Sequence, residues 1–128
     1  MSIGIISEDN NKYKKANNIS LKNYLNSKNY SFIETNGKYE GVLETVFVIN
    51  DITKDKLLEL GQRYGQESVI FLDKYDNQLI FIESNQLISL KKEIYSSLPN
   101  NINNYIYLPY YGYLVLIFSM KPGDSCGR

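Results

Sequence analysis

Residues 54–72, KDKLLELGQRYGQESVIFL, contain the strongest secondary-structure pattern in the chain. An apolar residue recurs every three or four positions in the first part, which predicts a helix with Thr53 as its N-cap. Gly65 is suited to end this helix, because glycine adopts the left-handed conformation at little cost. Gly61 lies on the apolar face and costs about 1 kcal/mol of helix propensity relative to alanine, so its presence favours a close approach to a sheet. The apolar run over residues 68–72 predicts a strand covered on both faces.

The flanking segments alternate between strand and helix patterns. Residues 21–28 predict a short helix, and residues 91–98 are compatible with another. Asn36 and Gly37 predict a tight turn, because both residue types tolerate a positive φ angle. Strands are expected over residues 30–35, 44–49, 78–83, 105–108 and 113–118.

These elements predict one α+β domain over residues 1–128, with a mainly antiparallel sheet and two or three helices packed on one face. The length suits a single domain that buries roughly two-thirds of the surface of its unfolded chain. Residues 1–18 are interpreted as a variable N-terminal segment and residues 121–128 as a flexible tail.

The composition excludes several classes of chemistry. The chain has no histidine and one cysteine, so histidine-based triads, histidine acid–base catalysis and paired-cysteine metal sites are absent. Its 14 basic and 14 acidic residues balance, which argues against polymeric nucleic acid and anionic membranes as partners. No nucleotide-binding glycine motif or nucleophile motif is found. We therefore expect no cofactor, no metal and a protein that binds rather than catalyses.

The sequence also favours a cytoplasmic location. The first residues lack the basic and apolar regions of a secretory signal, and residues 110–120 are shorter than the about 20 residues that span a bilayer as a helix. The lone Cys126 is better suited to a reducing compartment. Asn, Ile, Lys and Tyr are abundant, a bias typical of low-GC bacteria and their phages.

Two groups of candidate binding residues flank the predicted helix. Tyr39 and Glu40 lie beside Gly41, and Glu44 follows on the same expected strand, about 13 Å from Glu40, which is too far to share a proton. We interpret these acids as solvated charges. Their alternative role, together with Glu67, is in a carboxylate- or metal-dependent nuclease.

Arg63 and Gln66 are the second group. The planar guanidinium of Arg63 suits a phosphate or carboxylate, and Gln66 follows the helix where an amide can meet a ligand. Alternatively, Arg63 forms a salt bridge on the helix surface and Gln66 satisfies the carbonyls at the helix end.

The densest aromatic cluster lies near the C-terminus and comprises Tyr105, Tyr107, Tyr110, Tyr111 and Tyr113. Such tyrosines stack on bases in nucleic-acid sites, but no Lys or Arg occurs between Glu93 and Met120. A buried sheet face or a tyrosine-rich contact with another protein is the better interpretation. A small planar ligand is a further alternative.

Two patterns together resemble a known family. They are GKYEG with ETVFV, residues 37–41 and 44–48, and LGQRYGQESVIF, residues 60–71. In this order they are similar to short bacterial and phage proteins catalogued only as a domain of unknown function, over roughly residues 20–83. The resemblance implies a small accessory protein, often phage-borne, and no established activity.

Three hypotheses follow for the function. The first is a non-catalytic phage or prophage protein that inhibits or modulates a host protein, such as a defence protein, through Tyr107, Tyr110 and Tyr111. The second is a nucleotide-sequestering protein in which Arg63 and Gln66 bind a polar group of the nucleotide. Such proteins often bind their ligand between subunits, so a homo-oligomer is compatible with this hypothesis. The carboxylate nuclease is the third and the weakest.

Overall fold

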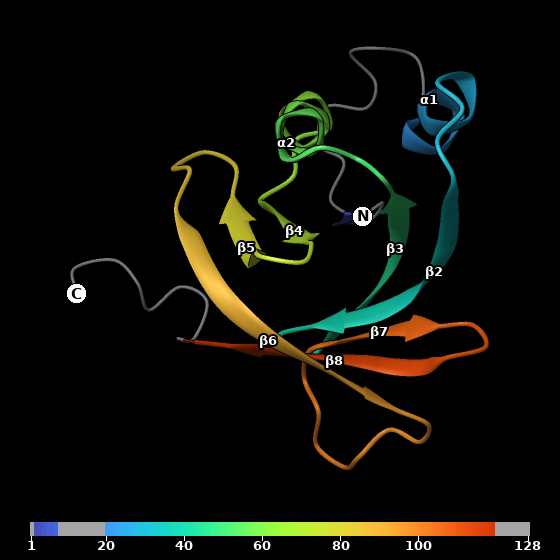
Figure 1. The fold of residues 1–128 in the computed structure, drawn as a ribbon, viewed down its shortest axis with the longest axis vertical. Helices are drawn as coiled ribbons and strands as arrows, with labels where there is room; N and C mark the ends of the chain where they lie inside the picture. Colours follow the sequence, from blue (N-terminus) through green and yellow to red (C-terminus); the bar gives the residue numbers. More distant parts are fainter. Residues whose placement is uncertain (1, 8–19, 120–128) are drawn as a thin grey trace.

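The computed structural model describes residues 2–7 and 20–119 as eight strands and two helices (Figure 1). In chain order these are β1 (Ile3–Ser7), α1 (Leu21–Ser27), β2 (Phe32–Tyr39), β3 (Val42–Asn50), α2 (Lys54–Arg63), β4 (Ser68–Leu72), β5 (Asn77–Phe81), β6 (Leu87–Tyr95), β7 (Tyr105–Leu108) and β8 (Gly112–Phe118). All neighbouring strands are antiparallel, and they form a closed barrel in the order β1-β3-β2-β7-β8-β6-β5-β4.

The expected α+β sheet with helices packed on one face is therefore wrong. Most of the strands were predicted, but closure depends on pairings between segments far apart in the chain. β1 joins β3 to β4, and β2 joins β7, so that the sheet has no open edge. Local periodicity contains no information about such pairings, which is why the expected strands were arranged in an open sheet.

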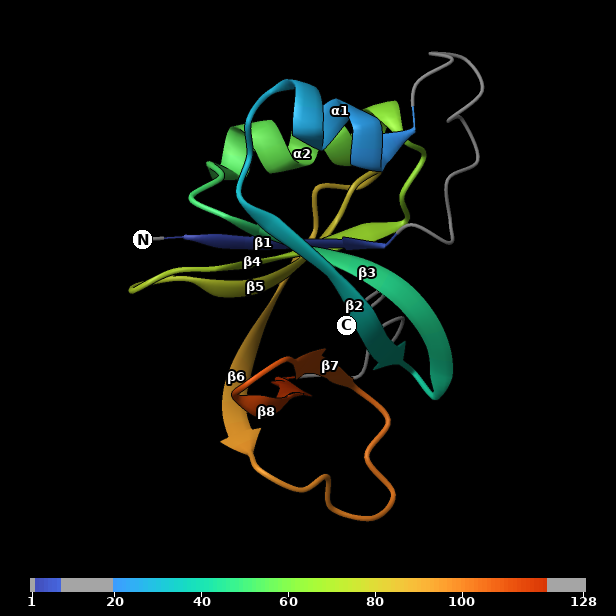
Figure 2. The same cartoon turned by 90° about the vertical axis from the view of Figure 1, so that its right-hand side faces the viewer.

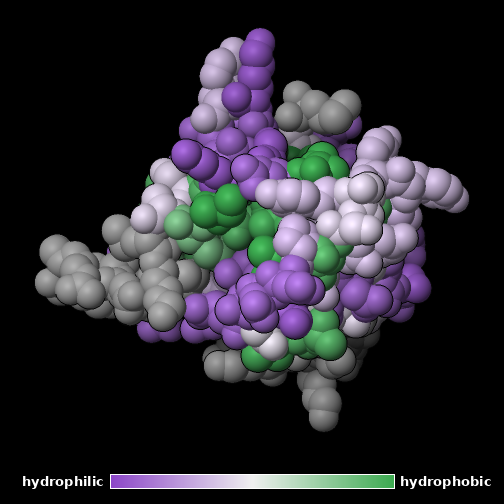
Figure 3. Space-filling model, turned by 90° about the horizontal axis from the view of Figure 1, so that it is seen from below, coloured by the Kyte–Doolittle hydropathy of each residue, from purple (hydrophilic) through white to green (hydrophobic). Residues whose placement is uncertain are grey.

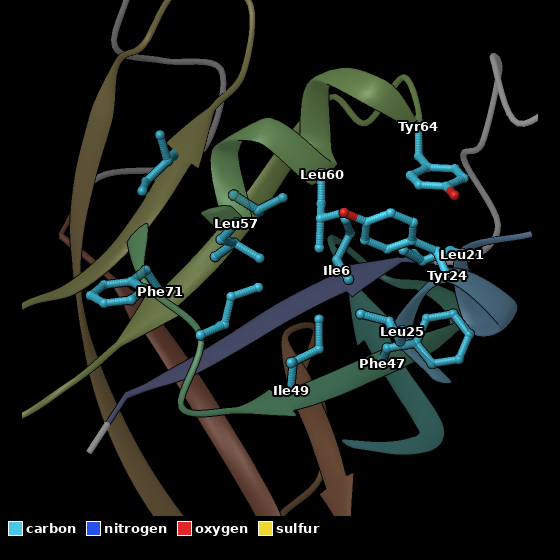
Figure 4. Close-up of a cluster of buried hydrophobic side chains, with 13 residues drawn as sticks. Ile6, Leu21, Tyr24, Leu25, Phe47, Ile49, Leu57, Leu60, Tyr64 and Phe71 are labelled. Atoms are coloured by element: carbon cyan, nitrogen blue, oxygen red, sulfur yellow. The ribbon is translucent and has the colours of Figure 1, made fainter. Parts of the chain in front are cut away.

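Two hydrophobic cores lie on opposite faces of one group of strands. The first, which includes Ile70 and Leu72, fills the barrel. The second, which includes Val69 and Phe71, lies between the barrel wall and the two helices (Figures 2 and 4). Successive residues of β4 thus point into different cores, and the expectation of a strand covered on both faces is confirmed.

The predicted helix over residues 54–64 is confirmed as α2. Thr53 accepts a hydrogen bond from the backbone N–H of Lys56 at 3.2 Å, and Gly65 follows the helix with φ 63°. The N–H of Gln66 donates to the carbonyl of Gly61 at 2.9 Å, which completes the hydrogen-bonded turn that ends the helix. A Cβ atom on Gly61 would lie 2.5 Å from Ile82 Cδ1, so the expected close approach to the sheet is also confirmed.

The turn predicted at Asn36 and Gly37 is wrong, because both residues lie inside β2. The chain turns instead at Glu40 and Gly41, whose φ angles of 47° and 82° suit a two-residue hairpin. Gly37 does not form a turn but lies where β2 packs closely against β7. A Cβ atom there would lie 2.9 Å from the carbonyl oxygen of Tyr105, so glycine allows β2 and β7 to approach.

The helix considered for residues 91–98 is wrong as well. Residues 91–95 belong to β6 and pair with residues 113–117 of β8. This pairing with a distant strand overrides the weak local helical pattern. At the N-terminus, Ile3–Ser7 form β1, although this run is too short to predict a strand from its sequence pattern alone. Most of the variable segment predicted over residues 1–18, and the tail predicted over residues 121–128, lie outside the described residues.

Within residues 2–7 and 20–119, neither helix has the length and apolar character needed to cross a lipid bilayer.

Gly37→Ala should lower the free energy of unfolding by about 1–3 kcal/mol, because the added methyl group forces β2 away from β7. Urea denaturation followed by circular dichroism measures the change. Asn36→Ala, at the exposed neighbouring position, is the control and should change stability by less than about 0.5 kcal/mol. Equal stability of Gly37→Ala and wild type would contradict a tightly closed junction between β2 and β7.

Candidate functional site

One end of the barrel brings together side chains from both motifs that were singled out in the sequence. Tyr39 and Glu44 come from the β2–β3 hairpin, and Gln66, Glu67 and Ser68 come from the junction of α2 and β4. They line a small cavity of about 40 Å³, room for only one or two water molecules. We call this end of the molecule the barrel mouth.

Tyr39 is the central side chain of the barrel mouth. Burial raises the pKa of Tyr39 to about 12, and the nearby Glu40, Glu67 and Glu44 carboxylates add to this effect. A hydrogen bond with the Ser68 side chain acts in the opposite direction. The phenol is therefore protonated at neutral pH, where it serves as a hydrogen-bond donor and not as a base or nucleophile.

Gln66 is only 5% exposed and lines the cavity, whereas its backbone N–H closes the end of α2. Gln66 thus satisfies a carbonyl at the end of α2, which is the structural role considered from the sequence. It also lines the barrel mouth. Its side chain comes there because the left-handed Gly65 turns the chain sharply from α2 into β4.

Arg63 is engaged elsewhere. Its guanidinium donates to Glu59 at 3.4 Å, and its Cζ lies 4.8 Å from the centre of the Tyr24 ring on α1. The salt bridge considered for Arg63 is therefore present. This geometry directs Arg63 toward α1, whereas Gln66 lines the barrel mouth. The two side chains therefore do not converge on one polar group of a ligand, although they are close in sequence.

Glu40 and Glu44 also differ from the expected arrangement on one strand face. Glu40 lies exposed in the β2–β3 turn, where its N–H donates to Asn104 Oδ1 at 2.8 Å, and Glu44 lines the barrel mouth from β3. Among the described residues, no three acidic, histidine or cysteine side chains gather closely enough to hold a metal ion.

The C-terminal tyrosine cluster lies on the outer face of the barrel, away from both helices. Tyr105 and Tyr113 pack edge to face with ring centroids 5.7 Å apart, and Tyr107 packs against Tyr113 at 5.2 Å. Tyr107 and Tyr111 are exposed, and Tyr110 is fully so. Viewed from below the barrel, the molecule presents separate hydrophobic patches between hydrophilic side chains (Figure 3). Of the interpretations considered for this cluster, the exposure of Tyr107, Tyr110 and Tyr111 excludes a buried sheet face.

Sequence reasoning missed several residues of this outer surface. Tyr95 lies opposite Tyr113 on the neighbouring strand, and Lys38 lies opposite Tyr105. Leu43 and Asn36 line a groove beside the tyrosines. The alternation of residues 87–95 could have indicated a strand that carries Tyr95, but the position of Lys38 depends on the pairing of β2 with β7.

Comparisons of the chain with models of protein families, with curated proteins and with solved structures found no match. The resemblance to a family of unknown function thus stays a prediction.

Tyr39→Phe should lower the free energy of unfolding by about 1 kcal/mol at neutral pH, because the hydrogen bond to Ser68 is lost. Above pH 10 the unfolded phenol ionises while the folded one stays protonated to about pH 12, so Tyr39 loses its stabilising contribution over this range. The stability advantage of the wild type should therefore shrink and then reverse in sign between pH 10 and 12, as measured by urea denaturation. Tyr75→Phe, outside the barrel mouth, is the matched control. A stability advantage of the wild type that grows with pH would contradict the assigned environment of Tyr39.

Proposed function

We propose that this protein acts by non-catalytic binding and docks a partner protein through the turn between β7 and β8. Tyr110 carries the proposal, because this tyrosine is 102% exposed and has a φ angle of 74°. A bulky residue in the left-handed region costs about 1–2 kcal/mol, and exposure of its ring brings no compensating burial. Backbone strain at an exposed tyrosine, with no burial to offset it, indicates a residue that serves in binding a partner rather than in stabilising the fold.

The local geometry explains how the two tyrosines are presented. Pro109 fixes the first central position of a turn in which the N–H of Tyr111 donates to the carbonyl of Leu108 at 3.0 Å. Glycine or asparagine is usual at the next position, where this chain has Tyr110. Tyr111 follows with 73% exposure, so two neighbouring rings extend from the end of the hairpin.

Tyrosine suits protein recognition because it buries a large apolar area, loses little conformational entropy and offers a hydroxyl group. The barrel mouth supports binding rather than catalysis, since its phenol is protonated and its cavity is too small for an organic substrate. We further propose that the partner is a host protein, that the protein is a phage or prophage modulator, and that it works in the cytoplasm. The balanced charge, the lone cysteine and the family resemblance support this part of the proposal.

Tyr110→Gly should raise the free energy of unfolding by about 0.5–1 kcal/mol, because glycine adopts the positive φ angle without strain. Urea denaturation measures this gain. Tyr75→Gly is the control, an exposed tyrosine with no such strain, and should not stabilise the fold. A destabilised Tyr110→Gly variant would show that Tyr110 serves the fold and would remove the basis of the proposal.

The double variant Tyr110→Ala/Tyr111→Ala should lose at least tenfold in affinity for a partner, as expected when two central aromatic residues are truncated. Affinity capture from bacterial lysate with quantitative mass spectrometry identifies proteins retained by wild type and lost by the variant, and titration of each purified candidate measures the affinity. Tyr75→Ala should retain the same partner. Equal capture by wild type and the double variant would refute docking through this turn.

A further inference from the structure

The outer face beside the tyrosine hairpin contains two rows of side chains that cross neighbouring strands in register. Both rows run in the direction β3, β2, β7, β8, β6. One consists of Leu43, Lys38, Tyr105, Val115 and Glu93. In the other, Thr45 pairs with Asn36 on β3 and β2, and Tyr107, Tyr113 and Tyr95 pair on β7, β8 and β6, with the register between β2 and β7 ending at Gly37, one residue short of Asn36. Because side chains two residues apart share a face, these rows lie next to each other on the barrel surface.

A groove of about 640 Å³ lies over these rows. Three tyrosines line it, namely Tyr105, Tyr107 and Tyr113, and its other side is lined by Asn36, Leu43, Glu44 and Thr45. This volume falls within the range of about 300–1,000 Å³ that is usual for small-molecule sites. The rings are held by their contacts with one another, at 5.7 and 5.2 Å between centroids, so the aromatic wall is already formed.

Lys38 lines the barrel mouth and is not part of the groove lining, but it places a positive charge beside the aromatic wall. Its ammonium group lies 6.0 Å from the centre of the Tyr105 ring, and no described carboxylate lies within ion-pair distance of it. Glu93, the acid at the far end of the same row, accepts a hydrogen bond from the Tyr95 hydroxyl at 2.7 Å. The Glu44 carboxylate also lines the groove, so a ligand's anionic group has to pair with Lys38 on the Tyr105 side. An aromatic wall with this cation beside it is complementary to a flat ring that carries a single anionic group.

We propose that this groove binds a nucleoside monophosphate. The base lies against Tyr107 and Tyr113, and the phosphate pairs with Lys38. The Cα atoms of Lys38 and Tyr113 are separated by about 7 Å along the strands and about 10 Å across two strand spacings, a span that a sugar and the lysine side chain bridge. One cation suits one phosphate, and it is too little for a polynucleotide backbone. The groove is lined by other residues than Tyr110 and Tyr111, so this site does not depend on partner docking.

Isothermal titration calorimetry of the full chain with adenosine monophosphate at low ionic strength tests the site. Adenosine alone and inorganic phosphate alone are separate arms, and both should bind at least fivefold more weakly than the nucleotide. Tyr113→Leu should weaken nucleotide binding roughly tenfold through loss of base stacking. Lys38→Gln should weaken nucleotide binding several-fold and leave adenosine binding unchanged.

Two matched controls separate the groove from general surface effects. Tyr75→Leu replaces an exposed tyrosine outside the groove, and Lys91→Gln replaces an exposed lysine of β6, so both should bind as wild type does. If Tyr113→Leu fails to fold, as judged by circular dichroism, Tyr107→Leu replaces it, because the Tyr107 side chain is exposed and contributes less to the fold.

Three outcomes would overturn the proposal. They are no saturable binding of adenosine monophosphate at millimolar concentration, nucleotide binding that Lys38→Gln and the tyrosine variants leave unchanged, and phosphate alone binding as tightly as the nucleotide. The Tyr110→Ala/Tyr111→Ala variant should bind the nucleotide normally. Loss of partner capture with retained nucleotide binding, or the reverse, therefore distinguishes failure of one proposal from failure of the other.

Discussion

Closure of the barrel between β2 and β7 is the constraint on which the rest of the structure depends. Only the pairs of Gly37 with Ile106 and of Lys38 with Tyr105 join these strands in register, and the Thr35 hydroxyl adds a hydrogen bond to the Tyr107 carbonyl at 2.8 Å. Without this junction, the β7–β8 hairpin would be attached to the barrel through β6 alone. Both β2 and β7 would then present unpaired backbone groups to solvent, a state that favours edge-to-edge association.

Closure also determines which part of the barrel surface is free for recognition. The two helices cover only one side of the barrel wall, where residues such as Phe47 and Phe71 point outward into the second core (Figures 2 and 4). On the opposite side no described helix covers the wall, and its outward positions carry tyrosines and Lys38. The short junction between β2 and β7 brings Lys38 beside Tyr105, although 66 residues lie between them in the chain. The same contact thus completes the fold and assembles the proposed ligand groove.

The elements with strong local patterns could be predicted from the sequence, whereas their arrangement could not. The apolar face and the caps of α2 indicate a helix without any tertiary context, and the apolar run of β4 indicates a strand buried on both faces. By contrast, Gly37 looks the same in sequence whether it forms a turn or allows a close approach between strands. Its neighbour Asn36 made the turn the better prediction, and only the pairing with β7 shows otherwise.

The candidate sites differ in the same way. The tyrosines near the C-terminus were predicted as a binding surface because their density is visible in the sequence, whereas Lys38 and Tyr95 join that surface only through strand pairing. Of the two roles considered for Arg63, the salt bridge is present, and Arg63 and Gln66 point in different directions because Arg63 pairs with Glu59 whereas Gln66 lines the barrel mouth. Residues that act together across a closed barrel are contributed by strands distant in the chain. For this fold, a functional surface is therefore better inferred from the rows of side chains that cross paired strands than from motifs along one segment.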